Sequence, residues 1–226
     1  GEIGNGTKVA APTPVDVVGL DSGAVAISAG NSTTCALLND GAVKCWGSNF
    51  GGSLGIGTLD DATVPTAVVG LSGVRAISGS GGHQCALQTG VTGAQCWGQN
   101  ALGALGSGDS EKAVAPQPVV DLPMMVDAIS AGRLHTCALI GGNAKCWGQN
   151  YSGELGNGGA RFYLHPTEVL TGEPGSSSVD GSLAIEYYHP GLDHYFITAN
   201  PLEVAGLDAQ VYPAVLGGQW ERTGQS

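Results

Sequence analysis

Residues 135–148 decide the fold, and they read His-Thr-Cys-Ala-Leu-Ile-Gly-Gly-Asn-Ala-Lys-Cys-Trp-Gly. Apolar runs flank Gly141-Gly142, and a glycine pair tolerates the positive φ angles that a two-residue hairpin turn demands. Counting outward from this turn places Cys137 opposite Cys146, where the two thiols can bond. The stretch therefore predicts a β-hairpin closed by a disulfide.

Two earlier stretches repeat this arrangement. Cys35 faces Cys45 across a three-residue loop that ends in glycine, and Cys85 faces Cys96 across the longer loop 88–94. Six cysteines placed as cross-strand pairs favour an oxidising compartment, because cytosolic thiols are kept reduced. We expect three disulfides, and the alternative is reduced thiols buried in the core.

The hairpins lie in units of about fifty residues, a period typical of propeller blades or of a solenoid. Each unit has four strand candidates: a strand of small residues, the two hairpin strands, and a Pro-Val segment after a glycine loop. A tryptophan follows the second cysteine of each hairpin, and we expect it to fill the gap between neighbouring sheets rather than to stack on a ligand. The predicted units are residues 19–69, 70–120 and 121–172, and their tryptophans are Trp46, Trp97 and Trp147.

Residues 1–18 carry the glycine loop and the proline of a repeat, without the three strands that come before them in the other units. Such a segment would leave backbone groups and apolar side chains in need of a partner. We therefore expect an orphan strand here.

The motifs follow one another in a fixed order over residues 1–172: Ile-Ser-Ala-Gly, His-x-Cys-Ala-Leu, Cys-Trp-Gly-x-Asn, Gly-x-Leu-Gly-x-Gly and Pro-x-x-Val. This order resembles the repeats of the regulator of chromosome condensation family, in the cysteine-paired form of its secreted bacterial members. The resemblance implies a β-propeller, usually of seven four-stranded blades. Three blades and an orphan strand are too few to close such a ring, so we expect an all-β partial propeller.

The pattern changes after residue 172. Residues 173–182, which are rich in serine and glycine, predict a linker. In residues 183–226 we expect short strands and a helix over 201–209, because Asn200 supplies an N-cap and Pro201 a first helical position. This part is similar to a small uncharacterised module of secreted bacterial proteins, and it predicts a small α+β unit that is incomplete.

Candidate residues for chemistry are few in the repeats. Ser53 lies in a Gly-Gly-Ser-Leu-Gly sequence that fits a nucleophile elbow, but alanine and glutamate replace it in later copies, so we expect a loop. His83 and His135 come two residues before a cysteine, and we expect structural histidines because those cysteines already have hairpin partners. We predict no catalytic residue, no metal ligand and no cofactor.

The densest titratable cluster lies in the terminal unit. Metal binding or stacking on a sugar is its functional interpretation, and a hairpin core with a solvated turn is its structural one. The candidate ligand-binding residues are Tyr188, His189, Asp193, His194 and Tyr195.

Charge argues against one class of partner. Nineteen Asp and Glu residues against eight Lys and Arg residues give a formal net charge of −11, which would repel a phosphate backbone. No apolar run in the sequence is long enough to span a bilayer. We expect neither a nucleic-acid partner nor a membrane span.

These observations predict a non-enzymatic extracellular binding or structural scaffold, secreted or held at the cell surface or in the periplasm. Its partner would be another protein, or a copy of itself that assembles through open blade edges. Two alternatives stay open. One is an inhibitor of an enzyme, since a secreted bacterial propeller with a similar repeat pattern blocks β-lactamases. The other is a carbohydrate-binding accessory module of a larger hydrolase, with a glycan as the partner.

Overall fold

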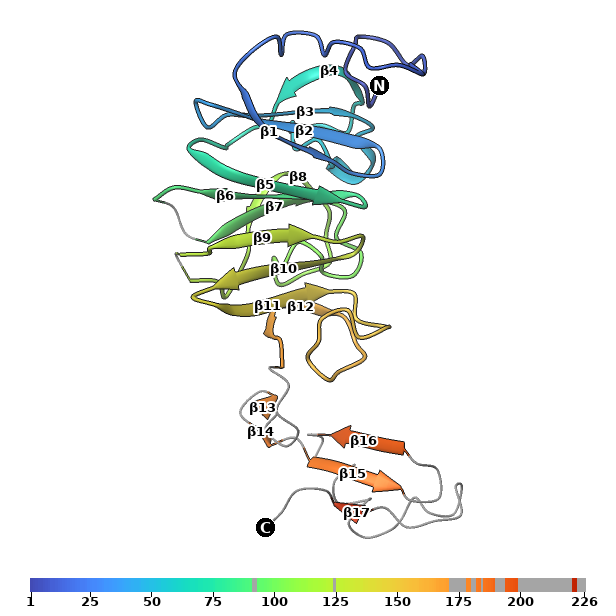
Figure 1. Cartoon of the computed structure of the whole chain (residues 1–226), viewed down its shortest axis with the longest axis vertical. Coiled ribbons are helices and arrows are strands. Elements are labelled where there is room, and N and C mark those ends of the chain that lie inside the picture. The colour runs from blue at the N-terminus through green and yellow to red at the C-terminus, as the bar shows by residue number, and fades with distance from the viewer. Residues whose placement is uncertain are drawn as a thin grey trace. The chain divides into compact units, whose positions relative to one another are not determined.

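The structure is a computed structural model that describes residues 1–90, 93–123 and 125–170, together with the backbone of five short strands after residue 170. The chain divides into two compact units, Gly1–Val169 and Leu170–Ser226. Three four-stranded antiparallel sheets build the first unit (Figure 1). The predicted fold class, an all-β partial propeller, is confirmed.

Each sheet is one blade, and its four strands are consecutive in the chain. A short 3-10 helix, η1 (Phe50–Gly52), opens the glycine loop of blade 1. Blade 1 consists of β1 (Ala24–Ala29), β2 (Thr33–Leu38), β3 (Val43–Gly47) and β4 (Ala62–Ala67). Blade 2 consists of β5 (Val74–Ser80), β6 (His83–Gln88), β7 (Ala94–Gly98) and β8 (Ala113–Pro118). Blade 3 consists of β9 (Ala128–Ala131), β10 (His135–Ile140), β11 (Asn143–Gly148) and β12 (Tyr163–Glu168).

The central hairpins have the register that their turns predict. In every blade the two cysteines are direct cross-strand partners, and each pair is disulfide-bonded with its Cα atoms 4.1 Å apart. Each bridge therefore ties the two middle strands of a blade together at the centre of its sheet. The bridges are Cys35–Cys45, Cys85–Cys96 and Cys137–Cys146.

Small residues let the first strands of the blades lie side by side (Figure 1). The backbone N–H of Gly79 in β5 donates to Ser28 Oγ in β1 at 2.8 Å. The same bond recurs between β9 and β5, where the N–H of Ala131 donates to Ser78 Oγ at 2.9 Å. A large side chain in place of either serine would push the strands apart, which explains why Ala, Ser and Gly dominate this strand of each repeat.

The tryptophans occupy the places that the repeat pattern predicts. Trp46, Trp97 and Trp147 are all buried, with at most 1% of their surface exposed. An apolar cluster runs through successive blades and includes Trp97, Trp147 and two leucines of the glycine loops, Leu54 and Leu105. The core thus lies between the sheets as well as within them.

One expectation at the N-terminus differs from the structure. Residues 1–18 contain turns and bends but no strand, whereas the repeat pattern predicts a strand there. In the three blades the last strand pairs with the second strand of its own hairpin, and among the described residues no strand edge pairs with residues 1–18. Without that edge the segment follows an irregular path over blade 1.

The second unit is described only through the backbone of its strands. β13 (Ser178–Val179) pairs with β14 (Ser182–Leu183), so part of the segment predicted as a linker is paired. β15 (Ile185–His189) pairs with β16 (His194–Thr198) and with β17 (Glu221–Arg222). The helix predicted over 201–209 lies outside the described residues. In the part of the chain that is described, no helix has the length and apolar character needed to cross a membrane.

Candidate protein-binding surfaces

Successive repeats are joined by one recurring set of hydrogen bonds. The tryptophan of each blade donates from Nε1 to a carbonyl in the glycine loop of the preceding repeat. The last glycine of that loop donates its N–H to a backbone carbonyl in the fourth strand of the blade that carries the tryptophan. We call this set a junction. The tryptophan bonds are Trp46 to Glu2 (2.8 Å), Trp97 to Ser53 (3.1 Å) and Trp147 to Ala104 (2.9 Å). The glycine bonds are Gly6 to Thr63 (3.0 Å), Gly57 to Val114 (2.9 Å) and Gly108 to Leu164 (3.0 Å).

A glycine under each tryptophan makes the junction sterically possible. Gly4, Gly55 and Gly106 all have positive φ angles, which glycine adopts without strain. A Cβ atom added at any of the three would lie 2.6 Å from the indole nitrogen. The second glycine of the Gly-x-Leu-Gly-x-Gly motif is therefore a contact surface for the next blade as well as a turn residue.

The fourth glycine loop, residues 153–158, has no such partner among the described residues. Within the described ranges no donor reaches the carbonyl of Glu154, and a Cβ atom added at Gly153 would meet nothing within 4 Å. Leu139 of blade 3 is 47% exposed, whereas its repeat equivalents Leu37 and Leu87 are 4% and 0% exposed because a further blade covers them. We call the surface formed by His135, Leu139 and residues 153–158 the open end of blade 3.

His83 shows what the equivalent of His135 does when a further blade is present. Its Nε2 lies 2.8 Å from Thr136 Oγ1 of blade 3. Because that hydroxyl donates its own hydrogen to the carbonyl of Ala104 at 2.8 Å, Nε2 of His83 is the donor. Burial, with a smaller contribution from the charge of His135, lowers the pKa of His83 to about 4. His83 is therefore a neutral structural residue of the junction, as the sequence predicts.

We expect the protein to lose stability on acidification because of His83. Its pKa is about 4 in the folded state against an ordinary value of 6.5, so the unfolded chain binds the proton first as the pH falls. Above pH 6.5 His83 is neutral in both the folded and the unfolded state, so its titration takes nothing from the free energy of unfolding. Between pH 6.5 and pH 4 the free energy of unfolding falls by about 3 kcal/mol. Urea unfolding at several pH values measures it. His83→Gln keeps a donor for Thr136 and removes the titration, so its pH dependence should be flatter by that amount, and equal slopes would contradict the assignment.

The turns between the first two strands of the three blades converge on a hollow of about 520 Å³. Asn31 comes from the turn of blade 1, Gly81 and Gln99 from blade 2, and Arg133 from the turn of blade 3. We call this surface the turn hollow. Asn31 and Arg133 are exposed and Gln99 is half-buried, so one guanidinium and two amides face solvent at a place that three blades share.

Glycines bring these turns together. Gly81 has a φ of 59°, and a Cβ atom added there would lie 1.9 Å from the carbonyl oxygen of Arg133. A Cβ atom at Gly82 would lie 2.3 Å from Gln99 Nε2. The turns of blades 2 and 3 thus contact each other through backbone atoms. This wall of the turn hollow therefore keeps its shape when side chains change rotamer.

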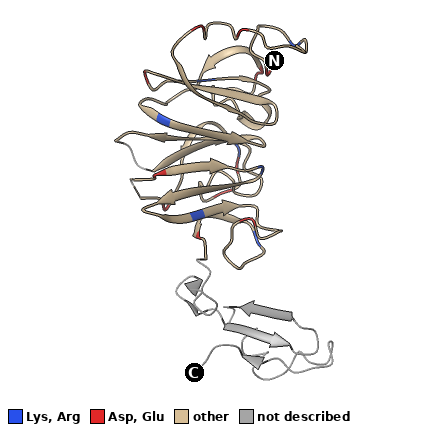
Figure 2. Ribbon diagram, viewed as in Figure 1, with Lys and Arg blue, Asp and Glu red and all other residues tan. Residues whose placement is uncertain are grey.

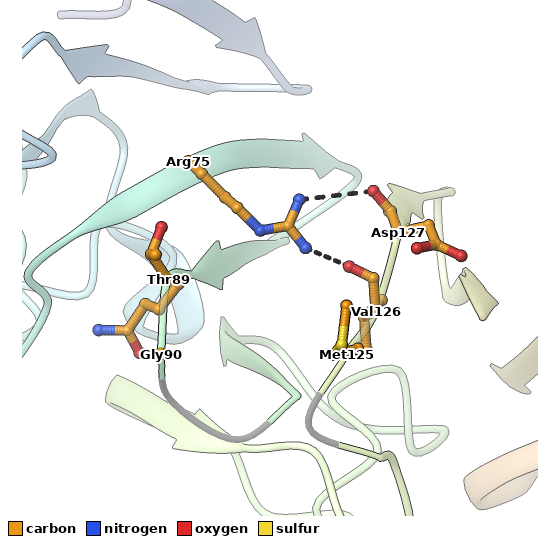
Figure 3. Close-up of a pocket in the computed structure, with 7 residues that line it drawn as sticks. Arg75, Thr89, Gly90, Met125, Val126 and Asp127 are labelled. Carbon is orange, nitrogen blue, oxygen red and sulfur yellow. Dashed lines mark hydrogen bonds between the residues drawn. The ribbon is translucent and has the colours of Figure 1, made fainter. Parts of the chain in front are cut away.

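A second hollow, of about 530 Å³, lies between β5, the end of β6 and residues 125–127 (Figure 3). The guanidinium of Arg75 reaches across it and donates to the backbone carbonyls of Val126 and Asp127. Those bonds connect blade 2 to the segment that enters blade 3. We assign Arg75 a structural role because its donors are directed at backbone.

The charged residues of the first unit are spread along its ribbon. Lys and Arg residues are scattered singly along the first unit, between Asp and Glu residues (Figure 2). A nucleic-acid surface needs several cations aligned along a phosphate backbone. The expectation that the protein has no nucleic-acid partner stays a prediction from the net charge of the sequence.

Ser53 lies in a structural loop. Its side chain is buried, donates to the carbonyl of Ser48 at 2.9 Å and lies 2.9 Å from Thr33 Oγ1. Across the ranges with described side chains, no three His, Cys, Asp or Glu residues are grouped so as to hold a metal ion.

Four of the five candidate ligand-binding residues of the terminal unit lie on one pair of strands, β15 and β16. The register places Tyr188 opposite Tyr195 and His189 opposite His194. Asp193 lies outside the described residues, and only the backbone of the other four is described. Ligand binding at this hairpin stays a prediction.

Sequence reasoning did not identify the turn hollow, and it predicted open blade edges without placing one of them at blade 3. The sequence signal for the hollow was the turn that separates the first two strands of each repeat. This turn reads Asn-Ser, Gly-Gly and Arg-Leu in the three copies, whereas the motifs on either side of it change little. The open end carries no signal of its own, because its motif is the same as that of the covered blades.

Comparison with known proteins assigns the repeats. Residues 24–52 match one model and residues 40–87 and 96–139 match a second, both described as the regulator of chromosome condensation (RCC1) repeat. The repeats are RCC1-like.

The curated relatives include the ultraviolet-B receptor UVR8 of Arabidopsis thaliana, which is 31% identical over 62% of this chain and 32% of the receptor. They also include the E3 ubiquitin-protein ligase HERC2 of Homo sapiens, 30% identical over 61% of this chain and 3% of the ligase. The chain thus spans a third or less of either relative.

Solved structures agree on the fold of the RCC1-like repeats. The structure of Prp20p from Saccharomyces cerevisiae superposes with a TM-score of 0.58 at 20% identity, over 66% of this chain and 38% of that chain. Yeast RCC1 (Prp20) in complex with Kap60 gives a TM-score of 0.59 at 20% identity, over 66% of this chain and 37% of that chain. At this identity the likeness supports the blade architecture alone.

Proposed function

We propose that the chain is a non-enzymatic extracellular scaffold whose RCC1-like blades bind a protein partner at the turn hollow. The observation that carries the proposal is the convergence of turns from three successive blades on one hollow. Each of these blades has a central hairpin that is closed by a disulfide. Loops held by a rigid scaffold are where recognition residues concentrate. The disulfides favour an oxidising compartment.

The relatives support protein binding as the class of function. The Prp20p structure was described together with the binding of Prp20p to Gsp1p and histones, and Prp20 has also been solved with Kap60 bound. The ligase activity in the name of HERC2 is not transferred, because the chain spans 3% of that protein. The binding surface of this chain is argued from its own residues.

The chemistry of the turn hollow selects the kind of partner surface. Arg133 is its cation, and a guanidinium binds a carboxylate with two parallel hydrogen bonds. Asn31 and Gln99 offer amide groups that pair with peptide N–H and C=O groups. We therefore propose a polar loop with an acidic side chain as the partner's contribution.

We expect a photoreactive amino acid at Asn31 to cross-link one discrete protein from the extracellular fraction of the source cells. The matched control carries the same amino acid at Val9, which is 73% exposed and lies outside the hollow. Arg133→Ala in the Asn31 variant should weaken the cross-link about tenfold, because a charge-assisted pair is lost. Identical products from the Asn31 and Val9 variants, or a cross-link that is insensitive to Arg133→Ala, would contradict the proposal.

A further inference from the structure

Blade 2 differs from the other two blades at one cross-strand pair near the turn between its first two strands. The pairs at this place are Ala29–Thr34 in blade 1, Ala131–Thr136 in blade 3 and Gly79–Gln84 in blade 2. A Cβ atom added at Gly79 would lie 1.5 Å from Gln84 Oε1. The glycine of blade 2 is therefore what admits the longer side chain opposite it.

The threonines at this place are hydrogen-bonded, and the glutamine is not. Thr34 donates to the carbonyl of Glu2 at 3.0 Å, and Thr136 makes the equivalent bond in its own junction at 2.8 Å. Gln84 is 2% exposed, and its amide has no hydrogen-bond partner among the described residues. An unpaired amide at this depth costs free energy of folding, so packing alone does not explain Gln84.

The amide of Gln84 borders the turn hollow. A Cβ atom added at Gly30 would lie 3.5 Å from Gln84 Nε2 and 3.6 Å from Ser80 Cα. Ser80 lines the hollow, as does Asn31, the residue after Gly30. In the described part of the chain, Asn157 Nδ2 is the only fully sealed side-chain nitrogen or oxygen without a partner. The small exposed area of Gln84 therefore lies at its polar end.

A second carboxamide at the hollow is also unpaired. Gln99 lines the hollow, and its repeat equivalent Gln149 donates to Glu154 Oε1 at 2.7 Å. Blade 2 has alanine in the place of Glu154, so Gln99 lacks that acceptor. Cβ atoms added at Gly51 and Gly82 would lie 2.4 and 2.3 Å from Cγ and Nε2 of Gln99. Backbone on both sides thus fixes the direction of this amide.

Two carboxamides with free groups select a particular kind of ligand group. Each offers N–H donors and a C=O acceptor side by side. A residue in an extended chain presents its own N–H and C=O toward the same neighbour, as in the hydrogen-bonded pairs of an antiparallel sheet. A carboxylate would satisfy the donors and leave both amide oxygens unpaired. The pair of amides therefore fits a main chain better than it fits an acidic side chain.

We propose that Gln84 and Gln99 bind the main-chain N–H and C=O groups of an extended segment in the partner's loop, while Arg133 binds the acidic side chain beside it. This inference rests on the proposed function and deepens it, because it names backbone as the second feature that the hollow recognises. Gln84 is the specificity-determining residue, since it occupies a place that threonine fills in the other two blades.

The double variant Gly79→Ala/Gln84→Thr removes the amide and rebuilds in blade 2 the pair that the other blades carry. Its threonine gains an acceptor in the carbonyl of Ser53, which already accepts from Trp97. We expect the variant to unfold at a higher urea concentration than the wild type, because an unpaired amide is replaced by a bonded hydroxyl. A rise in stability with a loss of binding separates recognition from damage to the fold.

The probe is a blocked dipeptide, N-acetyl-glycyl-glutamate N-methylamide, titrated into the isotope-labelled full chain and followed by heteronuclear NMR. The side-chain amide signals of Gln84 and Gln99 should shift. Those of Gln88 and Gln95, which are bonded to each other, are the internal control and should not. Acetate, which has a carboxylate and no peptide group, should leave Gln84 unmoved. The double variant should bind the dipeptide about fivefold more weakly or worse.

Two results would overturn the inference: a Gln84 signal that the dipeptide leaves unmoved, or a double variant that binds the dipeptide as tightly as the wild type. With either result, an Asn31 cross-link that still depends on Arg133 would leave the proposed function standing. A dipeptide that shifts Gln84, together with an Asn31 variant that gives no discrete cross-link, would support the inference and remove the extracellular protein partner.

Discussion

Trp97→Ala is expected to lower the free energy of unfolding by about 3–5 kcal/mol. The side chain is fully buried between blades 1 and 2, and its Nε1 donates to the carbonyl of Ser53 at 3.1 Å. Truncation leaves a cavity in the junction and a carbonyl without a donor. Denaturant unfolding followed by far-ultraviolet circular dichroism measures the loss.

Trp97→Phe is the matched control for this experiment. It keeps an aromatic ring in the gap and removes the Nε1–H, so its effect should be smaller than that of alanine by roughly 2 kcal/mol or more. Equal losses in the two variants would mean that the hydrogen bond, and not the filling of the gap, dominates the junction. A loss below about 1 kcal/mol for Trp97→Ala would contradict the role of the tryptophan as the wedge between blades.

Replacing Cys85 and Cys96 together with alanine is expected to lower the free energy of unfolding by about 2–3 kcal/mol. The bridge joins residues 11 apart in the sequence, at the centre of blade 2, and both cysteines are 0% exposed. Alanine preserves the apolar surroundings, so most of the loss comes from the missing cross-link. Chemical unfolding under oxidising conditions compares the variant with the wild type.

The reduced proteins provide the control for the disulfide prediction. In the presence of a strong reductant the wild type loses all three bridges, whereas the variant loses two, so the difference between them should shrink to the effect of two buried sulfur atoms. A difference that persists unchanged in reductant would mean that packing of the sulfur atoms, and not the covalent bridge, stabilises the hairpin.

The hairpins were predictable because their determinants are local. The turn Gly141-Gly142 sets the register, and the register places Cys137 opposite Cys146 a few residues away. The orphan strand expected in residues 1–18 was wrong for the opposite reason. A strand forms only against a neighbouring edge, and the sequence of the segment does not contain that edge.

The candidate surfaces depend on contacts between distant residues. Asn31 and Arg133 line the same hollow, although more than one hundred positions separate them in the sequence. Their proximity follows from the side-by-side packing of β1, β5 and β9, which the period of the repeats suggests but does not specify. No spacing within one repeat predicts which turns meet.

The sequence by itself determined the repeat period, the pairing of the cysteines and the position of the tryptophan wedge, because each follows from spacing along one hairpin or from one unit to the next. Only the tertiary structure decided which copies of a motif are covered by a neighbouring blade. Leu37, Leu87 and Leu139 occupy the same place in the same motif, yet only Leu139 is exposed. Burial is a property of the neighbouring blade and not of the motif, so the same motif is core in one blade and exposed in another.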